Sequence, residues 1–278
     1  MAELAEGQVL PVREVVAHNF AADSENKIHS DDVASEYGFK GGLVPGVGVY
    51  AYMTQPVVQA LGRDWLVRGD MTGKFIKPVY HGETVYVKSR VVGIDPIRIT
   101  VTAENANNEL CAIGEASFSE TKPQFTLTKY TLSPPPHREN RLAPSLSVLK
   151  KDLSLGALVV KFTDPEWSTE FLKDVVESEP IYQEPDVTWH PAVLPALANR
   201  VLVENINLGP WIHTDSDVDH HALPDRDEEV VVRSRIISAY EKRGHEMITI
   251  HVAFTGHGDR VLALMTHTAI VNPAKQQA

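Results

Sequence analysis

One stretch near the start of the chain decides the fold: residues 23–59, DSENKIHSDDVASEYGFKGGLVPGVGVYAYMTQPVVQ. It contains a histidine, His29, flanked by carboxylates, then a glycine-rich turn, and then a long apolar segment. The apolar residues of 47–61 recur at helical spacing and predict a buried helix that begins at the glycines. Pro56 lies inside this segment, where a proline is expected to kink the helix or restart it.

The start of this predicted helix is a candidate binding site. A helix N-terminus presents free backbone N–H groups and the positive end of the helix dipole. Gly46, which follows Pro45, allows a ligand oxygen to come close to the backbone. A protonatable histidine beside such donors suits acid–base chemistry on a carbonyl compound. Turn geometry and close packing against a sheet explain the glycines equally well, and His29 also suits a capping or surface position.

Strands are predicted on both sides of this stretch. Residues 8–20 form a first strand, and three further strand regions follow the helix at 65–80, 84–94 and 99–118, with Asn107–Asn108 at a hairpin tip. One long helix followed by several antiparallel strands is satisfied by a sheet that curves around the helix. Residues 121–152 contain Pro134–Pro136 and few periodic apolar positions, so we interpret them as a connector.

The second part of the chain repeats this order. Residues 155–163 resemble the first strand, Asp164 caps a short helix that passes Phe171, and residues 189–206 match the long helix. The clearest match is EVVVRSRIISA at 229–239 against TVYVKSRVVGI at 84–94. We therefore predict two helix-plus-sheet units, in residues 1–120 and 153–278. Their sheets can join edge to edge, which removes two exposed edges.

Composition limits the possible partners. The 278 residues carry a formal net charge of -11, which disfavours nucleic acid but leaves local basic residues able to hold a coenzyme phosphate. A single cysteine, Cys111, excludes an internal disulfide and fits a reducing cytosol. The first residues lack the basic start and apolar core of a signal peptide, and no run is long enough to cross a bilayer. We expect a cytoplasmic protein with no membrane partner.

A group of histidines and aspartates in the second half suggests a metal site. Strand alternation would place His213, Asp215, Asp217 and Asp219 on one face, next to His220–His221. In the repeat alignment the same segment is an ordinary strand. We therefore predict that no metal is bound.

The predicted fold class is α+β, and the duplicated helix-in-sheet unit resembles a double hotdog fold. The sequence SENKIHSDDVASEYGFKGGLVPGVGVY, residues 24–50, resembles the MaoC-like (R)-specific enoyl-CoA hydratase/dehydratase family. That family typically has an Asp-x-Asn-Pro-Ile-His segment, a short helix, and a glycine-rich turn into the central helix. The resemblance covers both halves at the level of the fold, and its motif lies in the first half only.

Residue by residue, the motif matches in part. Asn26 and His29 match the asparagine and the histidine of the family, and Ser24 stands where the catalytic aspartate is expected. Asp23 and Glu25 flank that position, so the resemblance implies that a small loop shift brings one of these carboxylates to His29.

The glycine-rich turn of the family reads Val44-Pro45-Gly46 in this chain, in place of Ala-His-Gly. Gly46 and Val47 therefore resemble the backbone donors to a thioester oxygen. In the second half, Tyr182 stands opposite His29 and the long helix opens with Pro191–Ala192. That half is expected to have no catalytic pair and to shape the acyl or coenzyme site.

The resemblance implies reversible addition of water to a 2-enoyl thioester. His29, helped by Asp23 or Glu25, would activate the water, and Gly46 and Val47 would stabilise charge on the thioester oxygen. No cofactor is expected, because the substrate carries coenzyme A or an acyl-carrier phosphopantetheine. Two alternatives stay open: a hotdog acyl-CoA thioesterase, and an inactive acyl-binding or scaffold protein. Monomer and homodimer are both compatible with a duplicated chain.

Overall fold

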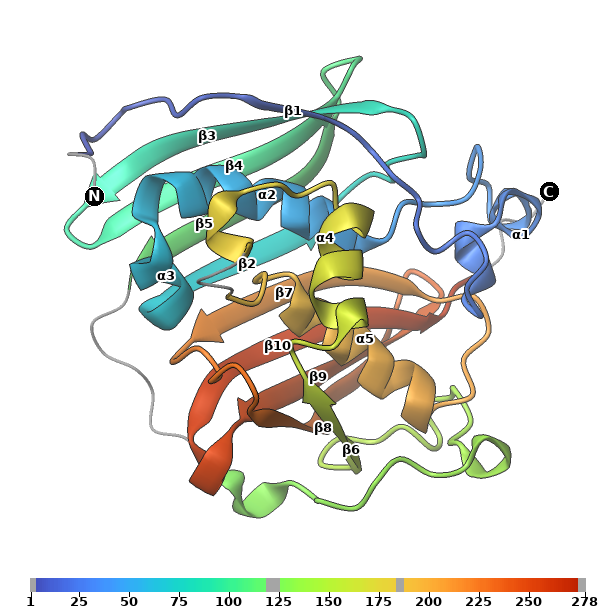
Figure 1. Ribbon diagram of the computed structural model, residues 1–278. Coiled ribbons are helices and arrows are strands. Elements are labelled where there is room, and N and C mark those ends of the chain that lie inside the picture. Colours follow the sequence, from blue (N-terminus) through green and yellow to red (C-terminus); the bar gives the residue numbers. More distant parts are fainter. Residues whose placement is uncertain (1–3, 119–125, 184–187, 275–278) are drawn as a thin grey trace.

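The computed structural model describes residues 4–118, 126–183 and 188–274. Its described strands form one antiparallel ten-stranded sheet in the order β1-β3-β4-β5-β2-β7-β10-β9-β8-β6 (Figure 1). All strands of the first half lie on one side, and all strands of the second half lie on the other. The two groups meet where β2 (Gly69–Phe75) pairs with β7 (Ile212–His220). This edge-to-edge junction agrees with the predicted joining of two sheets.

The strands follow the predicted repeat. The first half contains β1 (Arg13–Val16), β3 (Thr84–Ile94), β4 (Ile97–Asn105) and β5 (Leu110–Phe118). The second half contains β6 (Ser154–Lys161), β8 (Glu229–Lys242), β9 (His245–Thr255) and β10 (Val261–Asn272). Val85 and Val87 on β3 are fully buried, whereas Tyr86 between them is partly exposed, because successive side chains of a strand point to opposite faces.

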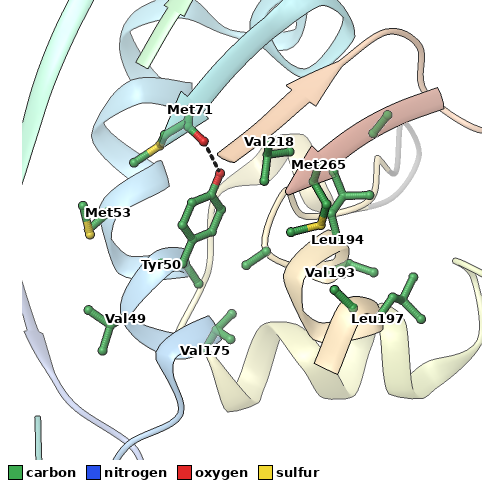
Figure 2. Close-up of a cluster of buried hydrophobic side chains, with 14 of the residues drawn as sticks. Val49, Tyr50, Met53, Met71, Val175, Val193, Leu194, Leu197, Val218 and Met265 are labelled. Atoms are coloured by element: carbon green, nitrogen blue, oxygen red, sulfur yellow. Dashed lines mark hydrogen bonds between the residues drawn. The ribbon is translucent and has the colours of Figure 1, made fainter. Parts of the chain in front are cut away.

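Two long helices cover the inner face of the sheet (Figure 1). These are α2 (Gly46–Leu61) and α5 (Val193–Asn205), one from each half. Figure 2 shows the core between them, where Tyr50 of α2 donates a hydrogen bond to Met71 O at 3.4 Å. Tyr50, Met71 and Val218 have exposed fractions of 0%. The two halves therefore share one apolar core.

The helix α2 continues through Pro56, so the restart that the sequence predicts does not occur. A proline has no N–H group, which leaves the carbonyl of the residue four positions earlier without its helical donor. That carbonyl belongs to Tyr52, and Nη1 of Arg13 lies 3.5 Å from it. A side chain from β1 thus supplies the donor that Pro56 lacks.

The segment after α2 differs from its prediction. Trp65 was predicted to begin a strand, but it lies in α3 (Arg63–Arg68), which follows Gly62, and β2 begins at Gly69. The Trp65 ring is fully buried against Gly69, where a methyl group would lie 2.0 Å from the indole. A large buried ring in contact with a glycine backbone therefore fixes this corner of the chain.

The remaining helical segments are short: α1 (Asp31–Glu36), α4 (Thr169–Asp174), η1 (Lys27–His29), η2 (Leu127–Lys129), η3 (Arg138–Asn140), η4 (Pro165–Trp167), η5 (Pro180–Tyr182) and η6 (His257–Asp259). No helix in the described part of the chain is both long and apolar enough to span a membrane. The predicted connector runs beside the second half, where Leu142 N donates to Asn205 O at 2.9 Å. Its residues 121–125 lie outside the described ranges.

Candidate functional site

His29 is the last residue of η1 and is held as a neutral imidazole. Its Nδ1 lies 2.7 Å from Leu43 O, and because a carbonyl only accepts, Nδ1 carries the hydrogen. Nε2 is then the basic nitrogen, 3.2 Å from Nδ2 of Asn26. Burial lowers the pKa of His29 below its usual value of 6.5. The ring is therefore uncharged at neutral pH, with one nitrogen able to take a proton.

Asn26 joins this loop to the second half. Its Oδ1 accepts from Trp211 N at 3.1 Å, and its Nδ2 donates to Trp211 O at 3.0 Å. Asn26 is also the N-cap of η1, with its side chain accepting from Ile28 N. The family resemblance pointed to Asn26 but not to Trp211, which is 185 residues away in the chain. No local pattern marks such a contact.

The N-terminus of α2 lies beside His29 and presents free donors. Pro45 is its N-cap, and the N–H groups of Gly48 and Val49 donate to Pro45 O at 2.9 and 3.3 Å. Within the described ranges, the N–H groups of Gly46 and Val47 have no hydrogen-bond acceptor. These are the two donors that the sequence predicted.

Two cavities meet at this place. The first, of about 220 Å³, has a mostly apolar wall formed by Phe39, Leu43, Val49, Phe75, Ile212 and Ile270. The second, of about 520 Å³, contains charged side chains in its wall: Glu25, Arg141, Glu166, Asp174, Arg200 and Glu204. His29, Asn26, Pro45, Asn199 and Trp211 line both cavities. His29 therefore stands where an apolar space adjoins a charged one.

The structure does not bring the predicted carboxylates to His29. Asp23 is exposed, and the exposed carboxylate of Glu25 lies 3.0 Å from Nη1 of Arg138. Ser24 makes a long contact of 3.4 Å with Asn26 O. Glu25 is paired instead with an arginine of the connector. The loop shift that the resemblance implied is absent from this arrangement.

In the second half, Tyr182 ends η5 just as His29 ends η1, which agrees with their predicted correspondence. It is buried, and its ring centre lies 4.7 Å from that of His190. Nε2 of His190 lies 3.6 Å from Oε2 of Glu177, and Nη1 of Arg13 lies 3.5 Å from the same oxygen. Neither cavity is lined by these residues. A buried ionic group occupies this region of the second half.

Burial alone would raise the pKa of the Glu177 carboxyl. The nearby imidazole of His190 and the charge of Arg13 outweigh burial and lower this pKa to about 2. Glu177 is therefore ionised at neutral pH.

The histidine and the aspartates of β7 lie on opposite faces, contrary to the alignment on which a metal site would depend. Asp215 pairs with Thr268 of β10 while His213 pairs with Ala269, so Thr214 is an extra residue in β7. This bulge shifts the alternation by one position. His213 is buried on the inner face, and Asp217 is exposed on the outer face. Among the described residues, no group of three or more His, Cys, Asp or Glu side chains is arranged to hold a metal ion.

Comparisons with known proteins agree with the fold. Residues 4–111 match the sequence profile of the MaoC like domain. A conserved hypothetical protein from Mycobacterium tuberculosis, described as having a double hotdog fold, superimposes with a TM-score of 0.65 at 16% identity over 96% of each chain. A MaoC-like dehydratase gives a TM-score of 0.63 at 11% identity, over 97% of this chain and 98% of that one.

A thioesterase is also similar. An acyl-CoA thioesterase II from Mycobacterium marinum superimposes with a TM-score of 0.54 at 13% identity, over 84% of this chain and 92% of that one. A comparison with curated proteins finds no match. The chain has a double hotdog fold of class α+β, as predicted. At these identities the structural similarity concerns the fold alone.

Proposed function

We propose that this protein binds acyl thioesters and catalyses the reversible addition of water to a 2-enoyl thioester. The proposal depends mainly on one observation. A neutral imidazole, His29, stands with the unpaired N–H groups of Gly46 and Val47 at the junction of an apolar and a charged cavity. This combination offers a base, an oxyanion site and separate spaces for the acyl chain and its polar carrier.

The donors at the start of α2 would bind the thioester oxygen. In hydration, the oxygen of water forms a bond to the β-carbon, and the electrons of the double bond move toward the thioester oxygen. Gly46 and Val47 would stabilise this developing negative charge together with the helix dipole. The loss of one such donor typically lowers kcat about 10²- to 10³-fold.

His29 would move the proton without a carboxylate. Its Nε2 takes a proton from water as the new C–O bond forms, and the same nitrogen then gives a proton to the α-carbon. Nδ1–H keeps its hydrogen bond to Leu43 O throughout, which orients the ring. The contact with Asn26 at 3.2 Å is at the long end for a hydrogen bond, so a bound water can replace it.

The charged cavity would receive the carrier of the acyl group. Arg200 is paired with Glu166 at 2.9 Å and with Glu204 at 2.8 Å, which satisfies its charge. The guanidinium of Arg141 is less tightly paired. Its Nη1 lies 4.0 Å from Glu25, and its buried Nε has no hydrogen-bond partner among the described residues. A phosphate or an amide oxygen of a pantetheine arm suits this guanidinium.

The test is turnover of crotonyl-CoA by His29 variants. His29→Gln is expected to lower the loss of enoyl absorbance about 10²- to 10⁴-fold, because general acid–base help is removed. His81→Gln is the matched control, since His81 lies in a turn that lines neither cavity. Circular dichroism checks that both variants fold. Wild-type turnover in His29→Gln would contradict the role of His29.

Hydrolysis of the thioester is a second candidate function, because it needs only the one base that His29 provides. Hydrolysis of a thioester needs one group that activates water and then protonates the departing thiolate, and His29 is such a group with no carboxylate paired to it among the described residues. The same assay distinguishes the reactions, because free thiol reports hydrolysis and loss of enoyl absorbance reports hydration. If a panel of acyl chains gives neither signal, an acyl-binding protein without catalysis is favoured.

A further inference from the structure

Beside the bulge at Thr214, a second histidine faces the same site. His213 is 6% exposed and lines the apolar cavity together with His29. A methyl group added to Gly46 would lie 2.9 Å from Nδ1 of His213, so this nitrogen faces the first residue of α2. Nδ1 of His213 has no hydrogen-bond partner in the described part of the chain. A buried polar atom without a partner is costly unless a ligand completes it.

The His213 ring is held firmly in this orientation. It stacks on His267 with ring centres 4.1 Å apart, and it packs edge-on against Phe75 at 4.7 Å. Its Nε2 lies 2.8 Å from Oγ of Ser216, which in turn lies 3.0 Å from Nδ1 of His267. The nitrogen that faces Gly46 is therefore preorganised by three neighbours.

The hydroxyl of Ser216 bears on which nitrogen of His213 carries the hydrogen. Burial keeps both imidazoles neutral, because it lowers the pKa of His213 well below its usual value and that of His267 to about 3. Ser216 has one hydrogen to share. If it donates to Nε2 of His213, then Nδ1 of His213 carries a hydrogen toward the cavity, and His267 donates to Ser216.

Without a ligand, each arrangement leaves one buried N–H group unpaired within the described ranges, and the two differ in where that group lies. In the opposite arrangement Ser216 would donate to His267, and the remaining N–H of His267 would be buried at Nε2, which has no partner among the described residues. Orphaned buried N–H groups are rare in native structures. The first arrangement places the spare N–H beside Gly46, so an oxygen bound at the start of α2 would favour it by accepting from this group.

Building on the function proposed above, we propose that His213 donates from Nδ1–H to the thioester oxygen, as a third donor beside Gly46 and Val47. The second half of the chain would then contribute a catalytic residue to the site of the first half. This explains why position 46 is a glycine, since any side chain there would collide with the imidazole.

Two replacements of His213 separate this role from packing. His213→Gln keeps a polar atom near Ser216 but loses the one at the cavity, whereas His213→Asn keeps an amide near the position of Nδ1. With crotonyl-CoA, the glutamine variant is expected to lose about 10²-fold in kcat with little change in KM. The asparagine variant is expected to stay within about tenfold of wild type. Equal kcat in the glutamine variant and wild type would overturn the proposal.

His220→Gln is the matched control. His220 is buried on the same face of β7, but it packs against Trp65 and lines neither cavity. Its kcat is expected to equal that of wild type. If His220→Gln lost as much kcat as His213→Gln, the effect would come from packing of the strand, and the proposal would fail.

Binding of butyryl-CoA separates this inference from the proposed function. This thioester is saturated and cannot be hydrated, so it occupies the wild-type site without reaction. In protein labelled with ¹⁵N-histidine, its binding is expected to shift the Nδ1 resonance of His213, which is assigned by its absence in His213→Asn. Binding without that shift would overturn the role of His213 while leaving the proposed function intact. Failure to bind butyryl-CoA and to convert crotonyl-CoA would overturn both.

Discussion

At the scale of single residues, one contact and burial set the protonation of His29. The carbonyl of Leu43 fixes the hydrogen on Nδ1, which leaves Nε2 as the base. Burial disfavours the imidazolium form and lowers the pKa of His29. A base with this pKa is already deprotonated at neutral pH, so it needs no activation by a neighbouring carboxylate.

This predicts the pH dependence of turnover. Because the folded pKa lies below 6.5, His29 is neutral through the neutral range and becomes protonated only at lower pH. We expect kcat/KM for crotonyl-CoA to be constant around neutral pH and to fall on the acid side of 6.5. The measurement is a pH–rate profile of wild type within the range where the protein stays folded. An acid limb with a midpoint above 6.5 would argue against an unassisted, buried imidazole.

The sequence predicts only part of this site. His29, Asn26 and Gly46 were found because they lie close together in one motif. Trp211 and His213 were missed as site residues because contacts between the two halves bring them to Asn26 and Gly46. The residue pattern alone placed His213 with the aspartates, since a bulge of one residue leaves no mark in the sequence.

At the scale of elements, α2 shows how a helix tolerates an internal proline. Arg13 of β1 lies 3.5 Å from the free carbonyl of Tyr52 and also 3.5 Å from Glu177 of the second half. The Arg13 side chain is 9% exposed and that of Glu177 is 0% exposed. One guanidinium thus connects a strand, a helix and the opposite half of the molecule.

This arrangement predicts a large loss in the free energy of unfolding when Arg13 is replaced. Arg13→Met leaves the carboxylate of Glu177 buried without its permanent counter-charge, which typically costs about 3–5 kcal/mol. Glu177→Gln leaves Arg13 unpaired and is also expected to destabilise. The double variant is expected to lose less than the sum of the two, because neither charge is then left alone. Urea unfolding of wild type, the two single variants and the double variant measures this coupling. Strictly additive changes in the free energy of unfolding would contradict it.

Elements were predicted well where their pattern was local. The helix of 46–61 and the hairpin at Asn107–Asn108 follow from apolar spacing and turn residues. The strand predicted to begin at Trp65 was wrong there, because the packing of this ring against Gly69 adds a helical corner. Tertiary packing overrode the local preference at that point.

At the scale of the whole molecule, the repeat in the sequence was enough to predict the double hotdog. Matching strands such as 84–94 and 229–239 became β3 and β8, next to the outermost strand of each half. The shared core then buried polar groups that the pattern did not indicate. Five histidines in the described part of the chain have a pKa lowered by burial: His29, His190, His213, His251 and His267.

These histidines predict a loss of stability in mild acid. Their unfolded pKa is near 6.5, whereas the folded values are lower, with His251 at about 4 and His267 at about 3. Below 6.5 the unfolded chain binds protons that the folded chain does not, so the free energy of unfolding falls as pH falls. Each histidine contributes up to about 1.4 kcal/mol per pH unit in this window.

Urea unfolding at about pH 7, 6 and 5 measures this slope. The Glu177 carboxyl, with its pKa at about 2, contributes only below its usual value of 4.5 and so does not interfere. His251→Gln is expected to make the free energy of unfolding depend less on pH, by the contribution of one histidine. A free energy of unfolding that stays constant between pH 6.5 and 5 would show that these imidazoles are protonated in the folded state.

The extra residue at Thr214 has a consequence for how the second half could diversify. Deleting it would restore strict alternation with His213 still on the inner face, because His213 would then directly precede Asp215 and keep its pairing with Ala269. The imidazole would keep its place through the loss of a single codon, and only the local twist of β7 would change. The junction between the two repeats can therefore lose this residue in evolution without losing the inward histidine.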